Sequence, residues 1–243
     1  MRNTVSIAAI LALGCLGLLA GVAQADQGST GAAFLQLDTS PRVIGMGDSF
    51  TGLADDVSDI EYNPAGSAYL TQKELTLMDA SWIQGISYDY GAVAWPFSFG
   101  TLSADFFYLN AGSFQGTALT GGGTGYVDTG TFTAGSMYGT VAYARKILPY
   151  LSLGLNLKFL NETIAEYAAS DISAGLSAFY RSPIPGLTAG FSISNLGPSE
   201  SFSGVTGTGA TASPLPANFR LGVGYKPTAD ISVDSDYVQY FNT

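Results

Sequence analysis

The chain contains no histidine and a single cysteine, Cys15, among its 243 residues. Histidine is the commonest general base and the commonest ligand of transition metals, so its absence rules out a Ser/His/Asp hydrolase and argues against catalysis in general. We therefore expect a protein that is not an enzyme and that carries no cofactor and no metal. A single cysteine also excludes a disulfide framework.

Positive charge is scarce as well. The chain has 9 Lys and Arg against 19 Asp and Glu, a formal net charge of −10, with no basic run. This balance argues against nucleic acid as a partner. Beyond residue 22 no run of about eighteen apolar residues exists, so the sequence predicts no membrane-spanning helix there. The hydrophobic content of 47% with only 12% charged residues excludes a disordered chain.

The N-terminus predicts a cleavable signal peptide over residues 1–25. Arg2 supplies a positive charge, residues 7–22 are apolar, and an A-x-A site ends at Ala25. Cys15 would suggest a lipoprotein, but the apolar run continues well beyond it. Cleavage after Ala25 removes one of the 9 basic residues and leaves 8 against 19 acidic ones, a net charge of −11.

Alternating apolar and polar residues dominate the rest of the chain, as in YLSLGLNLKFL from Tyr150 to Leu160. Successive side chains on a strand point to opposite faces, so such a segment has one apolar and one polar face. Strands of about ten residues with this repeat, behind an export signal, are typical of a transmembrane antiparallel β-barrel in an outer membrane. The predicted strands are 74–83, 86–95, 99–109, 131–144, 150–161, 170–181, 187–195, 217–226 and 229–240.

The connections between these strands differ in length. After the third strand, short connections alternate with longer Gly/Ser/Thr-rich stretches at 110–130, 162–169 and 196–216. Bacterial barrels have short periplasmic turns and long extracellular loops. The short connections are therefore expected on the periplasmic side and the long ones on the extracellular side. The short connection at 84–85 is an exception.

Aromatic residues gather beside the short turns and predict a girdle at the periplasmic membrane surface. The alternative is that aromatic residues are simply good strand formers. The predicted girdle consists of Trp95, Phe97, Tyr143, Tyr150, Tyr180 and Tyr225.

An odd strand count is unusual, because single-chain bacterial barrels have an even number of strands and periplasmic termini. A periplasmic start would leave Thr243 outside the cell, and the chain lacks the terminal aromatic residue usual for such barrels. We therefore expect residues 73–243 to be an incomplete barrel, truncated at its C-terminus. A miscounted strand is the alternative.

Residues 26–72 do not alternate and are predicted to form a separate segment. Asn63-Pro64-Ala65-Gly66 is turn chemistry, because proline fixes φ and glycine accepts a positive φ. The carboxylates of Asp55, Asp56 and Asp59 lack the spacing of an EF-hand. Helix capping or pairing with Arg42 is a better interpretation than calcium binding.

This N-terminal region resembles a known family. An F-L segment, P-R-V-I-G-M-G, A-D-D, N-P-A-G and a Trp-containing strand follow one another over about residues 32–97, and this order resembles the PorV/PorQ-type proteins of the FadL-like superfamily. The resemblance implies a wall of about fourteen strands with the N-terminal segment folded inside it as a hatch. It implies a place in the lumen for Arg42, Gly45, Met46, Gly47, Asp55, Asp56, Asn63, Pro64, Ala65 and Gly66.

A polar lumen would also accommodate the charged side chains of the strands. An Arg or Lys on the lipid face at the midplane costs about 2–4 kcal/mol, so Lys158, Arg220 and Asp171 should face inward or lie near the rim. Glycines on the polar faces could leave space for the hatch or could bend the strands. These glycines are Gly154, Gly175, Gly190, Gly222 and Gly224.

Three functions follow as hypotheses. The PorV/PorQ resemblance implies a non-enzymatic outer-membrane protein associated with protein secretion or surface attachment of a type IX kind, with secreted cargo or secretion-system components as partners. The FadL branch implies transport of hydrophobic small molecules, which requires an apolar pocket reaching the hatch. A soluble secreted β-sandwich is the third, since alternating strands fit it too.

Overall fold

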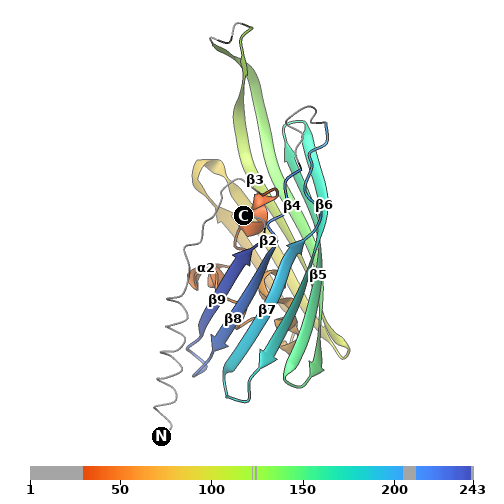
Figure 1. The fold of residues 1–243 in the computed structure, drawn as a ribbon. Helices are drawn as coiled ribbons and strands as arrows, with labels where there is room; N and C mark the ends of the chain where they lie inside the picture. The colour runs from red at the N-terminus through yellow and green to blue at the C-terminus, as the bar shows by residue number, and fades with distance from the viewer. Residues whose placement is uncertain (1–29, 122, 124, 205–211, 242–243) are drawn as a thin grey trace.

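The computed structural model describes residues 30–121, 123, 125–204 and 212–241 of the chain (Figure 1). The predicted signal peptide, residues 1–25, lies outside the described residues. Nine strands within the described part form one sheet in the order β1 to β9, and all nine predicted strands are confirmed. They are β1 (Glu74–Ser81), β2 (Ser87–Phe97), β3 (Gly100–Leu119), β4 (Tyr126–Leu148), β5 (Leu151–Ile164), β6 (Tyr167–Arg181), β7 (Leu187–Leu196), β8 (Asn218–Tyr225) and β9 (Val233–Tyr240).

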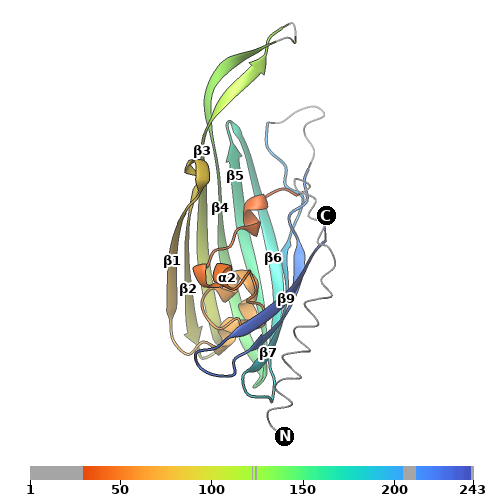
Figure 2. The same ribbon diagram turned by 90° about the vertical axis from the view of Figure 1, so that its left-hand side faces the viewer.

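The sheet is an antiparallel meander in which each strand pairs with the next. It curves around the segment that precedes it, as Figures 1 and 2 show from two sides. Strands β1 and β9 are its two edges, and no pairing joins them among the described residues. The fold class established here is therefore all-β with a single curved antiparallel sheet.

Two of the predicted loops are wrong. Strands β3 and β4 continue through 110–130 as a paired hairpin down to Leu119 opposite Tyr126. The cause is a stretch of strand-forming Thr, Phe and Val residues, in which Phe114 stacks on Phe132 across the pair with ring centroids 5.5 Å apart. The hairpin rises far beyond the neighbouring strands in Figure 1.

The predicted loop 162–169 is likewise mostly strand. Strands β5 and β6 are joined by a tight turn in which Ala165 takes a φ of 55°. The long connection predicted at 196–216 holds no regular strand in its described residues, apart from single bridges at Glu200, Ser203 and Ser213. At the other end, β2 continues through Pro96 to Phe97 before its turn.

Residues 30–72 lie in the hollow of the sheet, and we call them the interior segment (Figure 2). Prolines open two of its helices, which fits their fixed φ and missing N–H. Its helical turns are η1 (Ala33–Gln36), α2 (Pro41–Gly45), α3 (Asp59–Tyr62) and η2 (Pro64–Tyr69), and η3 (Ile83–Gly85) joins β1 to β2. In the described part of the chain, no helix combines the length and apolarity that crossing a membrane requires.

The polarity of the two faces of the sheet is the reverse of that usual in soluble proteins. On β5 the outward-facing Leu155 is 50% exposed, whereas the inward-facing Lys158 is only 5% exposed. Strands β6 to β8 repeat this pattern, with large apolar side chains outside and mainly small polar or charged residues covered inside, whereas the inner face of β2 to β4 also carries the buried rings of Tyr88, Tyr90, Phe107 and Tyr138. The alternation predicted from the sequence is confirmed, and the polar face is the one that packs on the interior segment.

Candidate functional site: the interior segment and its polar pocket

An aromatic cluster anchors the start of the interior segment. Phe34 of η1 stacks on Phe107 of β3 and on Tyr138 of β4, with 6.3 Å between the ring centroids in each pair. Phe107 and Tyr138 stack on each other at 4.8 Å. All three rings are almost completely buried, so this cluster fixes η1 against the sheet near the end that carries the long hairpin.

Glycines on the inner face let the interior segment approach the strands closely. A Cβ atom on Gly154 would lie 2.5 Å from the backbone nitrogen of Ala65, and one on Gly222 would lie 2.4 Å from that of Gly52. Gly190 and Gly224 meet the backbone of the same segment at similarly short distances. These four glycines therefore allow the interior segment to pack closely on the strands, which favours the first of the two interpretations over strand bending.

Gly175 is the exception among the predicted glycines. Its added Cβ atom would meet the Asn156 side chain and the Ile193 carbonyl oxygen, which belong to the sheet itself.

The N-P-A-G motif docks the other end of the interior segment. Asn63 Nδ2 donates to the carbonyl oxygens of Thr51 at 2.9 Å and of Ala178 at 3.2 Å. The backbone of Ala65 is held on both sides, since its N–H donates to Ser177 Oγ and its carbonyl accepts from Ser152 Oγ. These two serines were missed as site residues, although the polar stripes of β5 and β6 contain them.

A buried ion pair joins the interior segment to β5. Lys158 Nζ lies 2.7 Å from Glu61 Oε2, with both side chains nearly covered. The ammonium also lies 4.2 Å from the centroid of the Tyr138 ring. Burial alone would raise the pKa of Glu61, but the charge and the hydrogen bond of Lys158 outweigh it and lower this pKa. The inward orientation predicted for Lys158 is confirmed.

A second set of polar contacts comes from the two last strands. Arg220 of β8 pairs with Asp48 at 2.9 Å, which confirms its predicted inward orientation. On β9, Asp236 Oδ2 accepts the backbone N–H groups of Phe50 and Thr51, and Asp234 Oδ2 accepts that of Leu53. The two carboxylates thus satisfy the backbone of one turn of the interior segment.

The acidic stretch of the interior segment forms ion pairs with basic side chains. Arg42 pairs with Asp55 and with Asp56, and Lys226 of the β8–β9 connection also pairs with Asp55. The interpretation in terms of pairing with Arg42 is confirmed for these two carboxylates. The described residues contain no cluster of three or more His, Cys, Asp or Glu side chains placed to hold a metal ion.

Asp59 lies apart from this network and is completely buried. Neither of its carboxylate oxygens has a hydrogen-bond partner among the described residues. Burial raises the pKa of Asp59 well above its usual value, and the nearby Asp56 and Glu74 raise it further. Burial of this kind favours the neutral form of the carboxyl.

The other predicted residues lie on both surfaces of the protein. In α2 and the two residues after it, Arg42, Gly45 and Gly47 are exposed and Met46 is half-buried, whereas Pro64, Ala65 and Gly66 are buried. The aromatic residues predicted as a girdle lie beside the short turns. Trp95, Phe97 and Tyr143 form a row of stacked rings together with Phe99, with centroids 5.1 to 6.4 Å apart. Tyr150 packs edge-on against Tyr180, and Tyr225 is half-buried.

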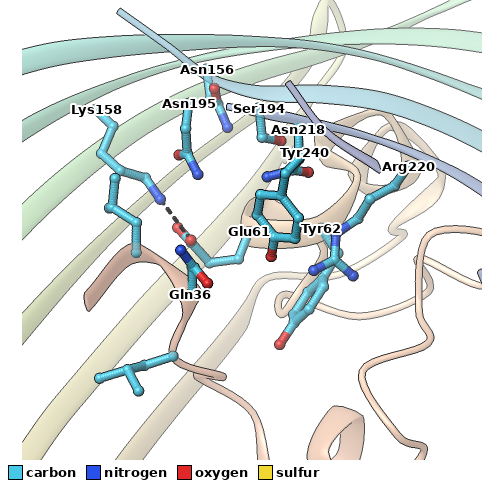
Figure 3. A pocket seen from close by; sticks show the side chains of 12 residues that line it. Gln36, Glu61, Tyr62, Asn156, Lys158, Ser194, Asn195, Asn218, Arg220 and Tyr240 are labelled. Atoms are coloured by element: carbon cyan, nitrogen blue, oxygen red, sulfur yellow. Dashed lines mark hydrogen bonds and ion pairs between the residues drawn. The ribbon is translucent and has the colours of Figure 1, made fainter. Parts of the chain in front are cut away.

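A polar pocket lies between the interior segment and strands β5, β7, β8 and β9 (Figure 3). Its volume is about 40 Å³. The Glu61–Lys158 pair forms one side, and side chains from the interior segment and from four strands converge on the same space. The polar lining consists of Gln36, Glu61, Tyr62, Asn156, Lys158, Ser194, Asn195, Asn218, Arg220 and Tyr240.

A second, mainly apolar pocket lies beside η1, where β3, β4 and β5 extend past the interior segment. Its volume is about 310 Å³. Phe34 and Leu37 contribute from the interior segment, and Leu109, Ala134 and Ile164 contribute from the strands. This pocket was not predicted from the sequence, because it depends on the strands extending through stretches that were predicted as loops.

The fold and this interior define an all-β protein in which the interior segment fills the hollow of a curved antiparallel sheet with an apolar outer face. The chain belongs to the uncharacterised protein family UPF0164, whose family profile matches residues 6–160. No curated protein and no solved structure matches the chain.

Proposed function

We propose that this chain is a non-enzymatic outer-membrane protein whose sheet forms part of a β-barrel wall around a hatch, and that it acts in protein secretion or surface attachment. Membrane residence is supported by the apolar outer face. Leu151 to Phe159 covers eight steps of about 3.3 Å, and a tilt of about 40° turns this into about 20 Å of height, close to the apolar band of about 25 Å in such barrels. A soluble sandwich would bury these leucines against a second sheet.

Closure into a barrel is part of this proposal. In an antiparallel meander the two edge strands β1 and β9 run in the same direction, because they are an even number of steps apart. Pairing them with each other would be parallel. An antiparallel barrel wall therefore takes an odd number of strands between β9 and β1.

The observation that carries the functional part is the long β3–β4 hairpin. Beyond Asn110 and before Thr133, these strands pair only with each other, so both outer edges of the hairpin leave backbone groups unpaired. The hairpin projects from the end opposite the short turns, which is the extracellular end in bacterial barrels. Open strand edges accept extended polypeptides by strand addition.

One experiment tests the membrane location of the protein and the proposed role of the hairpin separately. Carbonate-washed outer membranes should retain the full chain, and also a variant in which a short turn replaces residues 112–131. Only the full chain should co-purify with exported proteins after cross-linking at the cell surface. Loss of both proteins in the carbonate wash would refute membrane residence, and equal cross-linking would refute the role of the hairpin.

The apolar pocket beside η1 favours a second candidate, the binding of hydrophobic small molecules. Its volume of about 310 Å³ lies at the lower end of the range for ligand pockets, and Phe34 and Leu37 bring it into contact with the hatch. Native mass spectrometry of the detergent-purified protein should then detect bound lipid. A Leu109→Asn variant should lose that lipid, and a protein without any bound lipid would contradict this candidate.

A further inference from the structure

The polar pocket of Figure 3 contains hydrogen-bonding groups that the docking of the interior segment does not use. Among the described residues, no group hydrogen-bonds to the side chains of Gln36, Ser194 or Tyr240. Asn218 donates to the Pro216 carbonyl, but its Oδ1 atom is buried without a partner. Asn218 is buried, Ser194 and Tyr240 are half-buried, and Gln36 is exposed. Buried polar groups are normally satisfied by protein or by a bound molecule, so the Asn218 oxygen and the two half-buried hydroxyls point to an occupant.

The charges around the pocket are already compensated within the protein. Lys158 pairs with Glu61 at 2.7 Å, and Arg220 pairs with Asp48 at 2.9 Å. A charged ligand would enter a site whose cations and anions are both engaged. The groups left over are a carboxamide, hydroxyls, an amide oxygen and the second carboxylate oxygen of Glu61, which is buried without a partner among the described residues. Together they donate and accept hydrogen bonds. These groups suit an uncharged molecule with hydroxyl or amide groups.

The size of the pocket limits this molecule. A cavity of about 40 Å³ accommodates about three water molecules, at roughly 10–15 Å³ for each. Three waters occupy about the same liquid volume as a polyol of two or three carbon atoms.

We propose that the polar pocket between the interior segment and strands β5, β7, β8 and β9 binds a small uncharged polyol or amide, with glycerol as its model ligand. Ser194, Asn218 and Tyr240 hold the ligand from three neighbouring strands, and Gln36 holds it from the interior segment. This site does not depend on whether the sheet lies in a membrane.

Saturation-transfer NMR on the full chain in detergent tests the proposal, with glycerol, acetate and methylammonium as probes. Glycerol should give a saturable signal, and the two ions should give none that saturates. Ser194→Leu fills the pocket and should abolish the glycerol signal. Tyr240→Phe removes only one hydroxyl and should weaken binding by about threefold or more while the melting temperature stays unchanged. Ser235→Leu, on the outer face of β9, is the matched control and should bind like the original protein.

Three outcomes would overturn the proposal. They are a glycerol signal that fails to saturate, an equal signal in Ser194→Leu and Ser235→Leu, and stronger binding of either ion than of glycerol. The first outcome would leave the pocket as a water site only.

Discussion

Gly190 of β7 lies so close to Thr51 that a Cβ atom on the glycine would be 1.9 Å from the Thr51 carbonyl oxygen. The same added atom would be 2.5 Å from Asn63 Nδ2, which itself donates to this carbonyl. The Thr51 backbone and the hydrogen-bonded side-chain amide of Asn63 thus both contact the inner face of the sheet at Gly190. Neither neighbour is the free end of a flexible side chain, so the contact has no room for a larger residue.

Gly190→Ala should therefore loosen the interior segment. Overpacking of a tight contact typically costs about 1–3 kcal/mol, and here the backbone has to move. Thermal unfolding should show a lower melting temperature, and limited proteolysis should cut within residues 50–66. Gly139→Ala is a suitable control, because its Cβ atom would lie an ordinary 3.7 Å from its nearest neighbour. Equal stability of the two variants would contradict the close-packing argument.

The Glu61–Lys158 pair should be costly to break on one side only. Removing one partner of a buried ion pair leaves an unpaired charge and typically costs about 3–5 kcal/mol, whereas replacing both partners is much less destabilising. Denaturant unfolding of Glu61→Gln, Lys158→Met and the double variant measures this coupling. We expect each single variant to be less stable than the double variant. Additive effects would show that the two side chains do not act as a pair.

Asp59 should make stability depend on pH. Its pKa is raised in the folded state, so the folded protein binds a proton more tightly than the unfolded chain does. This contribution is fully present below the unfolded pKa of about 3.9 and is lost as pH rises through the folded pKa. Asp59→Asn keeps the shape but cannot ionise. Its stability relative to the original protein should therefore increase from pH 4 to pH 8, as measured by melting temperatures across that range, and a constant difference would refute the assignment.

The strand pattern could be predicted from the sequence because the alternation is a local signal. Leu153, Leu155 and Leu157 mark the outer face of β5 without any knowledge of its neighbours. The hairpin beyond Asn110 could not be predicted so simply, since its Gly- and Thr-rich stretches resemble a loop until Phe114 and Phe132 are seen to pair across it.

The candidate site depends on long-range contacts and was therefore only partly predictable. Lys158 and Arg220 could be assigned inward because a charge is costly in lipid. Their partners Glu61 and Asp48 lie 97 and 172 residues away in the chain, and no local pattern encodes such pairs. The polar pocket likewise collects residues from six separate elements, so only the folded sheet brings Gln36 and Tyr240 to the same space.

A charge on the outer face of β5 tests the proposed contact with lipid. Leu155 lies in the middle of the apolar stretch of that face, and Tyr150 lies at its short-turn end, in the connection before β5. Arginine at the midplane of a barrel wall costs about 2–4 kcal/mol, and near the interface it costs about 0–1 kcal/mol. Leu155→Arg should therefore reduce folding into lipid vesicles strongly, whereas Tyr150→Arg should have little effect. Both side chains are about half exposed, so two arginines of equal and small effect would show that water rather than lipid covers this face.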